Sequence, residues 1–148
     1  MTFWQSFKAM PALLKFFTAH AFFCSIAFVG AVIPNDSVQI DGRAVSFAEL
    51  WRSGVGPFMV ILGAAMPATA LLMLGRKPYA RQAYLAALSF AMVVPYLVLG
   101  DLPLALFGVA FVALVAWYMF GKRSAREYFA SNNAFHSDGS RAARENRR

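Results

Sequence analysis

The chain has 148 residues, of which 59% are hydrophobic. Its mean hydropathy is +0.54, which is too apolar for an ordinary soluble domain. The single cysteine excludes an internal disulfide, and the formal net charge of +7 at pH 7 is informative mainly through its distribution along the chain. We predict an all-α membrane protein: a four-transmembrane-helix bundle with a short structured extracytoplasmic loop.

The membrane prediction rests on four long apolar segments separated by short polar ones. An α-helix rises about 1.5 Å per residue, so a segment of about 20 residues crosses a hydrocarbon layer about 30 Å thick. Backbone groups in lipid need partners within the same segment, which favours helices over strands. We expect a four-helix membrane domain over residues 1–131, with helices at about 11–33, 55–74, 82–100 and 102–121 and an outer loop at 34–54.

The first predicted helix follows an amphipathic segment in which Phe3, Trp4 and Phe7 alternate with polar residues, as at a membrane interface. The helix carries His20 near the middle of the membrane, where an ionisable residue is a candidate functional group. A neutral histidine can equally hydrogen-bond across helices, and no second ionisable residue at that depth completes a proton relay or a metal site. A cleaved signal peptide is the alternative interpretation of this segment, since residues 29–31 resemble a cleavage site.

The outer loop carries two local folding signals. Asp41-Gly42 lies between β-prone residues, which is the pattern of a two-residue hairpin turn. Ser46 followed by Glu49 is a capping box and predicts a short helix that begins at Phe47. We expect either a lid on the outer end of the bundle or a docking surface, whose candidate partner-binding residues are Arg43, Phe47, Glu49, Trp51 and Arg52.

Small residues recur every four positions on one face of the second and third predicted helices, which permits close helix packing. They are Ala64 and Ala68 in the second helix and Ala83, Ala87 and Ala91 in the third. Pro67 should kink the second helix, because proline lacks the N–H of a helical hydrogen bond. The turn at 100–103 is too short to hold a domain, so the last two helices form an antiparallel hairpin, with Asp101 capping the fourth.

Basic residues set the predicted orientation. Of the 14 Lys and Arg, Arg43 and Arg52 are the two in the outer loop, and the others lie near the ends and in the loop 75–81. The positive-inside rule then predicts cytoplasmic N- and C-termini. We expect Lys122, Arg123 and Arg126 to contact lipid headgroups. Residues 132–148 are poor in apolar side chains and should form a disordered basic cytoplasmic tail, without the interleaved aromatics that would indicate a nucleic-acid partner.

The end of the fourth helix carries a family resemblance. The segment AWYMFGKRSAREYFAS at 116–131 contains Trp117, Lys122-Arg123 and Tyr128-Phe129. It resembles the helix-four exit of small uncharacterised four-helix bacterial inner-membrane proteins, and the basic loop at 75–79 is similar in character. The resemblance implies a multi-pass protein of the bacterial inner (plasma) membrane. It implies no known activity and transfers no site residues.

The sequence contains no constellation that names a reaction, so we predict no enzyme and no cofactor. The leading hypothesis is a non-catalytic accessory or protective protein, surrounded by the lipid bilayer, that binds another membrane protein. One alternative is a small transporter subunit that works as an oligomer by self-association. The other is a membrane enzyme that uses the outer-face acids, which are Asp36, Asp41, Glu49 and Asp101.

Overall fold

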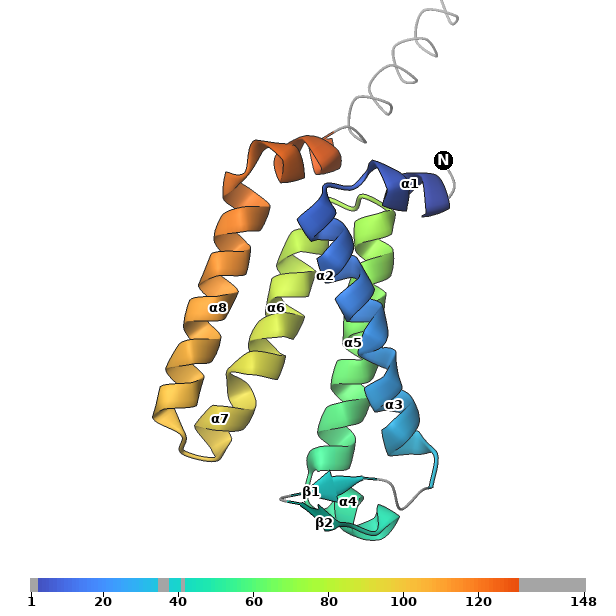
Figure 1. Ribbon diagram of the computed structural model, residues 1–148, viewed down its shortest axis with the longest axis vertical. Helices are drawn as coiled ribbons and strands as arrows, with labels where there is room; N and C mark the ends of the chain where they lie inside the picture. Colours follow the sequence, from blue (N-terminus) through green and yellow to red (C-terminus); the bar gives the residue numbers. More distant parts are fainter. Residues whose placement is uncertain (1–2, 35–37, 41, 131–148) are drawn as a thin grey trace, which may run out of the picture.

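The computed structural model describes residues 3–34, 38–40 and 42–130. Up to residue 52 the elements are α1 (Phe3–Ala9), α2 (Ala12–Phe23), α3 (Ser25–Val32), β1 (Gln39–Ile40), β2 (Arg43–Ala44) and α4 (Phe47–Arg52). They are followed by α5 (Val55–Leu74), α6 (Ala80–Met92), α7 (Val94–Val98) and α8 (Leu102–Gly121). A further helical segment, the exit helix, covers 123–130. Figure 1 shows that the long helices run roughly along one axis.

The all-helical prediction is confirmed, and four helical stretches are long and apolar enough to cross a membrane. Two of them, α5 and α8, have the predicted bounds. The other two are each divided, since α2 is followed by α3 at Cys24 and α6 by α7 at Val93. The helices predicted at about 11–33 and 82–100 thus correspond to helical stretches at Ala12–Val32 and Ala80–Val98, each with one break that was not predicted. In contrast, α5 continues through Pro67 as one helix.

Each break has a local chemical cause. Proline at position 95 has no N–H, and its ring excludes the carbonyl one turn earlier, so the helix is interrupted at Val93. At the other break the Ser25 hydroxyl donates to the Phe22 carbonyl at 2.7 Å. A serine that hydrogen-bonds back to its own helix often bends that helix. The sequence analysis missed this second break because no proline or glycine marks it.

Two glycines of the neighbouring helices lie against these breaks. A Cβ atom on Gly63 would lie 2.7 Å from Phe28 Cβ and 2.9 Å from the Cys24 carbonyl oxygen, and one on Gly108 would lie 2.9 Å from the Met92 carbonyl carbon. The backbones therefore touch where α3 meets α5 and where α6 meets α8. The prediction that Ala64 and Ala68 line the close contact is wrong, because both are exposed.

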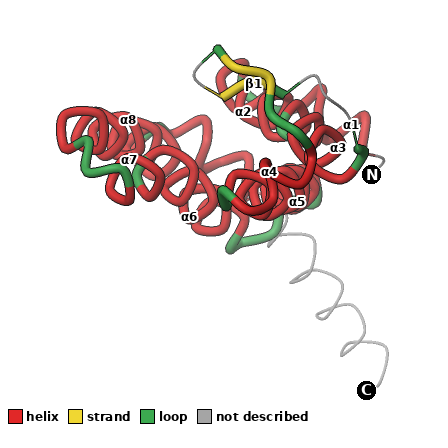
Figure 2. The backbone as a smooth tube through the Cα atoms, turned by 90° about the horizontal axis from the view of Figure 1, so that it is seen from below, coloured by secondary structure: helices red, strands yellow, loops and turns green. Residues whose placement is uncertain are grey.

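The long helices are arranged in a row rather than in a closed ring, with α2 and α3 packed on α5, α5 on α6, and α6 on α8 (Figure 2). They lie close together at the end that carries α1 and the exit helix, which we call the terminal end, and diverge toward the opposite, hairpin end (Figure 1). The Phe17 ring lies 5.8 Å from the ring of Tyr84 and 5.9 Å from that of Tyr118. Elements α2, α6 and α8 thus meet in a core near the terminal end.

The exit helix closes the core at the terminal end. It buries Ala125, Tyr128 and Phe129. The Tyr128 hydroxyl lies 3.2 Å from the carbonyl oxygen of Met73 in α5 and 3.4 Å from that of Ser6 in α1. Arg81 of α6 donates to the Met119 carbonyl at 3.3 Å. These contacts connect the exit helix with α1 and α5, and α6 with α8, so the terminal end joins helices that are distant in the sequence.

Candidate functional site

The hairpin end carries a small folded unit, the outer module, made of β1, β2 and α4. The two strands pair antiparallel, with Gln39 opposite Ala44 and Ile40 opposite Arg43. That register leaves two connecting residues, and the second, Gly42, has φ of +75°. A positive φ is required in the hairpin turn that the Asp-Gly pattern predicts, and glycine adopts it without strain.

Helix α4 begins where the capping pattern predicts. The Ser46 hydroxyl oxygen accepts the Glu49 backbone N–H at 3.3 Å. The Glu49 carboxylate forms an ion pair with Arg43 of β2, so the reciprocal half of the predicted capping box is replaced by a link between strand and helix. Because both side chains are substantially exposed, this pair contributes about 0–1 kcal/mol, and its main effect is to orient two charged groups.

Buried contacts hold the outer module on α3 and α5. Leu50 is fully buried, and the Trp51 indole N–H donates to the Ala31 carbonyl at 3.0 Å. Ala31 lies in the last turn of α3, where carbonyl groups have no partner within the helix. A Cβ on Gly56 of α5 would lie 3.2 Å from Trp51 Cγ, so a larger residue at this position would crowd the indole.

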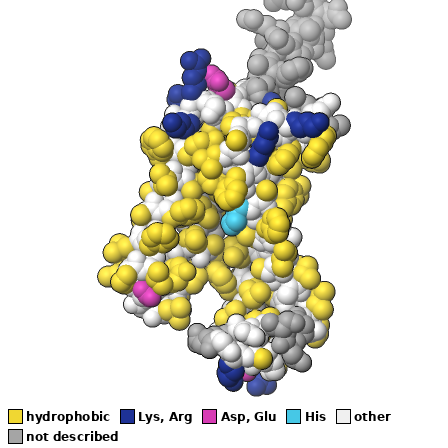
Figure 3. Space-filling view, in the orientation of Figure 1, with side chains coloured by type: hydrophobic (Ala, Val, Ile, Leu, Met, Phe, Trp, Pro, Cys, Tyr) yellow, Lys and Arg dark blue, Asp and Glu magenta, His cyan; other side chains and the backbone are white. Residues whose placement is uncertain are grey.

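The predicted partner-binding residues lie together on this module but do not share one role. Arg43 and Arg52 are exposed, whereas Phe47 and Glu49 are half-buried. Trp51 is 40% exposed, and its ring lies 6.1 Å from that of Phe47. Trp51 attaches the module to the bundle through Ala31, and the arginine side chains are exposed on the module's surface. Figure 3 shows basic side chains at this end of the molecule.

The outer acids that the structure describes both have structural partners. Asp101 caps α8, because its carboxylate accepts the Leu104 N–H at 3.1 Å. Glu49 is paired with Arg43 on the other branch of the hairpin end. The α7–α8 turn and α4 lie on separate branches in Figure 1. Asp36 and Asp41 lie outside the described residues, and within 3–34, 38–40 and 42–130 no three His, Cys, Asp or Glu residues gather as metal ligands.

His20 lies on α2 at the edge of a cavity of about 360 Å³, which we call the central cavity. Side chains of α2, α5, α6 and α8 line it, and they include Cys24, Tyr84 and Phe111. The His20 ring stacks on Phe16 with 6.5 Å between ring centroids. His20 is exposed, and Figure 3 shows mainly hydrophobic side chains on the surface between the two charged ends. Sequence reasoning selected His20 but not Tyr84, because nothing local distinguishes that tyrosine from a core residue.

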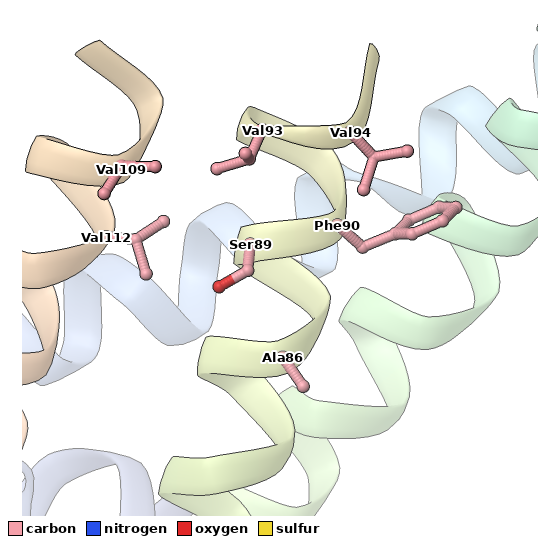
Figure 4. A pocket seen from close by; sticks show the side chains of 7 residues that line it. All are labelled: Ala86, Ser89, Phe90, Val93, Val94, Val109 and Val112. Atoms are coloured by element: carbon pink, nitrogen blue, oxygen red, sulfur yellow. The ribbon is translucent and has the colours of Figure 1, made fainter. Parts of the chain in front are cut away.

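A second cavity of about 490 Å³ lies where α6 and α7 face α8 (Figure 4). Its lining is aliphatic or aromatic except for Ser89, whose hydroxyl donates to the Leu85 carbonyl at 2.7 Å. Val109 and Val112 approach from α8, while Val93 and Val94 approach from the helix break. Because the Ser89 proton is already donated to Leu85, the cavity offers a ligand no side-chain donor.

The three predicted headgroup residues lie at the terminal end. Lys122 Nζ lies 5.3 Å from the centre of the Trp117 ring, and Arg123 forms an ion pair with Glu127 at 2.6 Å. Arg126 is exposed on the exit helix. Burial raises the pKa of the Tyr128 phenol on the opposite face, so the hydroxyl stays protonated as a donor. The exit helix thus presents basic side chains outward and hydrophobic ones to the core.

Comparisons with protein-family models, curated proteins and solved structures find no match to this chain. The resemblance of residues 116–131 to the helix-four exits of small bacterial inner-membrane proteins therefore stays a prediction. Arguments about function rest on the geometry of the outer module and of the central cavity.

Proposed function

We propose that the chain is a multi-pass protein of the bacterial inner membrane, with both termini in the cytoplasm and the outer module on the extracytoplasmic side. Four apolar helices of membrane-crossing length support this assignment. So does the clustering of Lys and Arg around the terminal end, seen in Figure 3, with Arg43 and Arg52 at the other end. Hydrophobic side chains cover the surface between the two ends (Figure 3), as a lipid environment requires.

Its function, in this proposal, is that of a non-catalytic accessory or protective protein that binds another membrane protein through the outer module. The observation that carries this proposal is the division of the module into an attached face and a free one. Leu50 and Trp51 attach it to α3 and α5, whereas Arg43 and Arg52 are exposed on it. A surface ordered before binding loses less conformational entropy on binding than a flexible loop does.

The enzyme alternative has less support, because the carboxylates of Glu49 and Asp101 already act in an ion pair and in a helix cap. A reaction at either group would first have to break that contact. The transporter alternative needs a second copy of the chain to complete a pathway, so it predicts self-association. The proposal therefore predicts that another membrane protein contacts the outer module, whereas the transporter alternative predicts contact with a second copy of the chain.

Site-specific photo-crosslinking in cells tests the proposal. A photoreactive amino acid replaces Ala48, which is exposed on α4, and in a matched control it replaces Leu99, which is 78% exposed at the α7–α8 turn of the same end. We expect a discrete adduct with another membrane protein at position 48 and none at position 99. Joint replacement of Arg43, Glu49 and Arg52 by Ser should abolish that adduct at unchanged abundance of the protein.

Other outcomes contradict the proposal in distinguishable ways. An adduct of twice the chain mass would indicate self-association and favour the transporter alternative. Equal labelling at positions 48 and 99, or an adduct unaffected by the triple replacement, would leave the module as a lid without a docking role. Orientation is tested separately with a reporter active only in the cytoplasm: it should work after Arg148 or within 76–81 and fail after Asp41, and the reverse pattern would refute the topology.

A further inference from the structure

The central cavity combines a mostly apolar lining with two hydrogen-bonding side chains that approach from different helices. His20 comes from α2 and Tyr84 from α6, and the remaining lining is hydrophobic apart from the Cys24 thiol. The cavity lies about halfway along the candidate membrane spans, as shown by the position of His20 within Ala12–Val32. A ligand at this depth would have to enter from the hydrocarbon layer and not from water.

Tyr84 is a buried residue in the wall of this cavity. Its side chain is 1% exposed, and among the described residues its hydroxyl makes no hydrogen bond. A buried donor left unsatisfied costs about 1–3 kcal/mol. Most buried hydroxyls therefore have a partner in the protein or in a bound molecule.

His20 differs from Tyr84 in being exposed rather than buried. Its ring is in contact with Phe16, and in the part of the chain that the structure describes its nitrogens make no hydrogen bond. Hydrocarbon supplies no partner to an imidazole N–H, so the cost is not relieved by exposure to lipid. Two polar groups that border one cavity are thus available to the same ligand.

The lining also restricts the chemistry of that ligand. A volume of about 360 Å³ falls in the range of small-molecule pockets, about 300–1,000 Å³. No Lys, Arg, Asp or Glu is among the described lining residues, so a charged ligand would find no counter-ion. The tyrosine hydroxyl and the imidazole N–H are both donors, and they match an acceptor oxygen such as a carbonyl.

We propose that the central cavity binds a neutral, lipid-soluble carbonyl compound, with Tyr84 and His20 donating hydrogen bonds to its oxygen. The rest of the ligand replaces lipid or empty space against Phe17, Leu62 and Met66. The proposal is independent of the outer module, because it concerns a different part of the fold and needs no protein partner. The second cavity does not share this chemistry, since its one hydroxyl is already bonded to Leu85.

Benzophenone is a suitable probe, because it is a neutral lipophilic ketone that inserts into nearby C–H bonds on illumination. The purified full chain in mild detergent is photolabelled, and the labelled positions are mapped by mass spectrometry. We expect labels to concentrate on cavity residues such as Met66 and Met92. In the dark, excess benzophenone should slow the reaction of a maleimide with Cys24, the one cysteine of the chain. Diphenylmethane has a similar shape but no carbonyl, and it should protect the Cys24 thiol less.

Two variants isolate the hydrogen bonds. Tyr84→Phe removes only the hydroxyl, and His20→Phe removes the imidazole, and each should lower benzophenone affinity by roughly three- to tenfold, the effect of one hydrogen bond. Ser89→Ala is the matched control, because it removes a hydroxyl from the neighbouring cavity on the same helix, and it should leave affinity unchanged. Ala91→Leu fills the central cavity and should suppress labelling there.

Three results would overturn the proposal. They are labels spread evenly over lipid-facing side chains, equal protection of Cys24 by benzophenone and diphenylmethane, and unchanged affinity in both Tyr84→Phe and His20→Phe. Thermal unfolding of each variant without the probe shows whether it is folded. The isosteric Tyr84→Phe keeps the test valid if His20→Phe is unstable.

Discussion

Replacing Gly63 by Ala should separate α3 from α5 and destabilise the protein. The added Cβ would lie 2.7 Å from Phe28 Cβ and 2.9 Å from the Cys24 carbonyl oxygen, and both distances are shorter than carbon atoms tolerate. Because the nearest neighbours include backbone atoms, a change of side-chain rotamer cannot relieve the clash. The helices must move apart at the point where α2 is followed by α3.

Two opposing effects determine the magnitude. Alanine favours helix over glycine by about 1 kcal/mol, whereas overpacking a well-filled contact costs about 1–3 kcal/mol. Gly30→Ala supplies the matched control, because Gly30 is also helical but its added Cβ would meet only Met59 Cε, at 3.8 Å. Helix propensity is common to both variants, so Gly63→Ala should be less stable than Gly30→Ala by about 1–3 kcal/mol.

The assay is thermal unfolding of the purified full chain in mild detergent, followed by tryptophan fluorescence. A second readout is the reaction rate of the Cys24 thiol with a maleimide, since Cys24 lies at the helix break beside Gly63. We expect Gly63→Ala to melt at a lower temperature and to react faster, and Gly30→Ala to melt at the wild-type temperature or above. If the two variants melt together and their thiols react equally fast, the close backbone contact at Gly63 is refuted.

Three further substitutions test single hydrogen bonds. Trp51→Phe should cost about 0.5–1.5 kcal/mol in denaturation experiments, because it keeps an aromatic ring but loses the N–H bonded to Ala31; unchanged stability would contradict that contact. Ser46→Ala should cost about 1 kcal/mol through the lost cap and should make the outer module more sensitive to protease, and equal sensitivity would speak against the cap. Tyr128→Phe should accelerate amide hydrogen exchange in 123–130 but not in α8, and acceleration in both would mean that the hydroxyl has no local role.

The outer module shows how far local patterns extend. The register of β1 and β2 and the cap at Ser46 follow from neighbours within a few residues, so the sequence was sufficient to predict them. The ion pair of Glu49 with Arg43 was not predicted, because the capping pattern offered the carboxylate a different partner. The bond from Trp51 to Ala31 joins positions 20 residues apart, and no local pattern contains that information.

The length and hydrophobicity of the helices and the placement of basic residues are properties of the sequence by itself. They depend on backbone chemistry and on transfer between water and an apolar phase, which act residue by residue. Only the tertiary structure decided which small residues bring helices together. Ala64 and Ala68 have the expected spacing, yet Gly63 is in contact, because the face that α5 turns toward α3 depends on how both helices pack.

The same distinction applies to the central cavity. His20 stood out in the sequence because an imidazole is rare among apolar residues. Tyr84 became a candidate only when the fold placed it in the wall of the cavity, where its hydroxyl makes no hydrogen bond to any described residue. Hydrogen bonding in an apolar interior is a property of pairs of groups and not of single residues. Whether a polar side chain is satisfied or available therefore depends on distant parts of the chain, and tertiary packing alone brings those parts together.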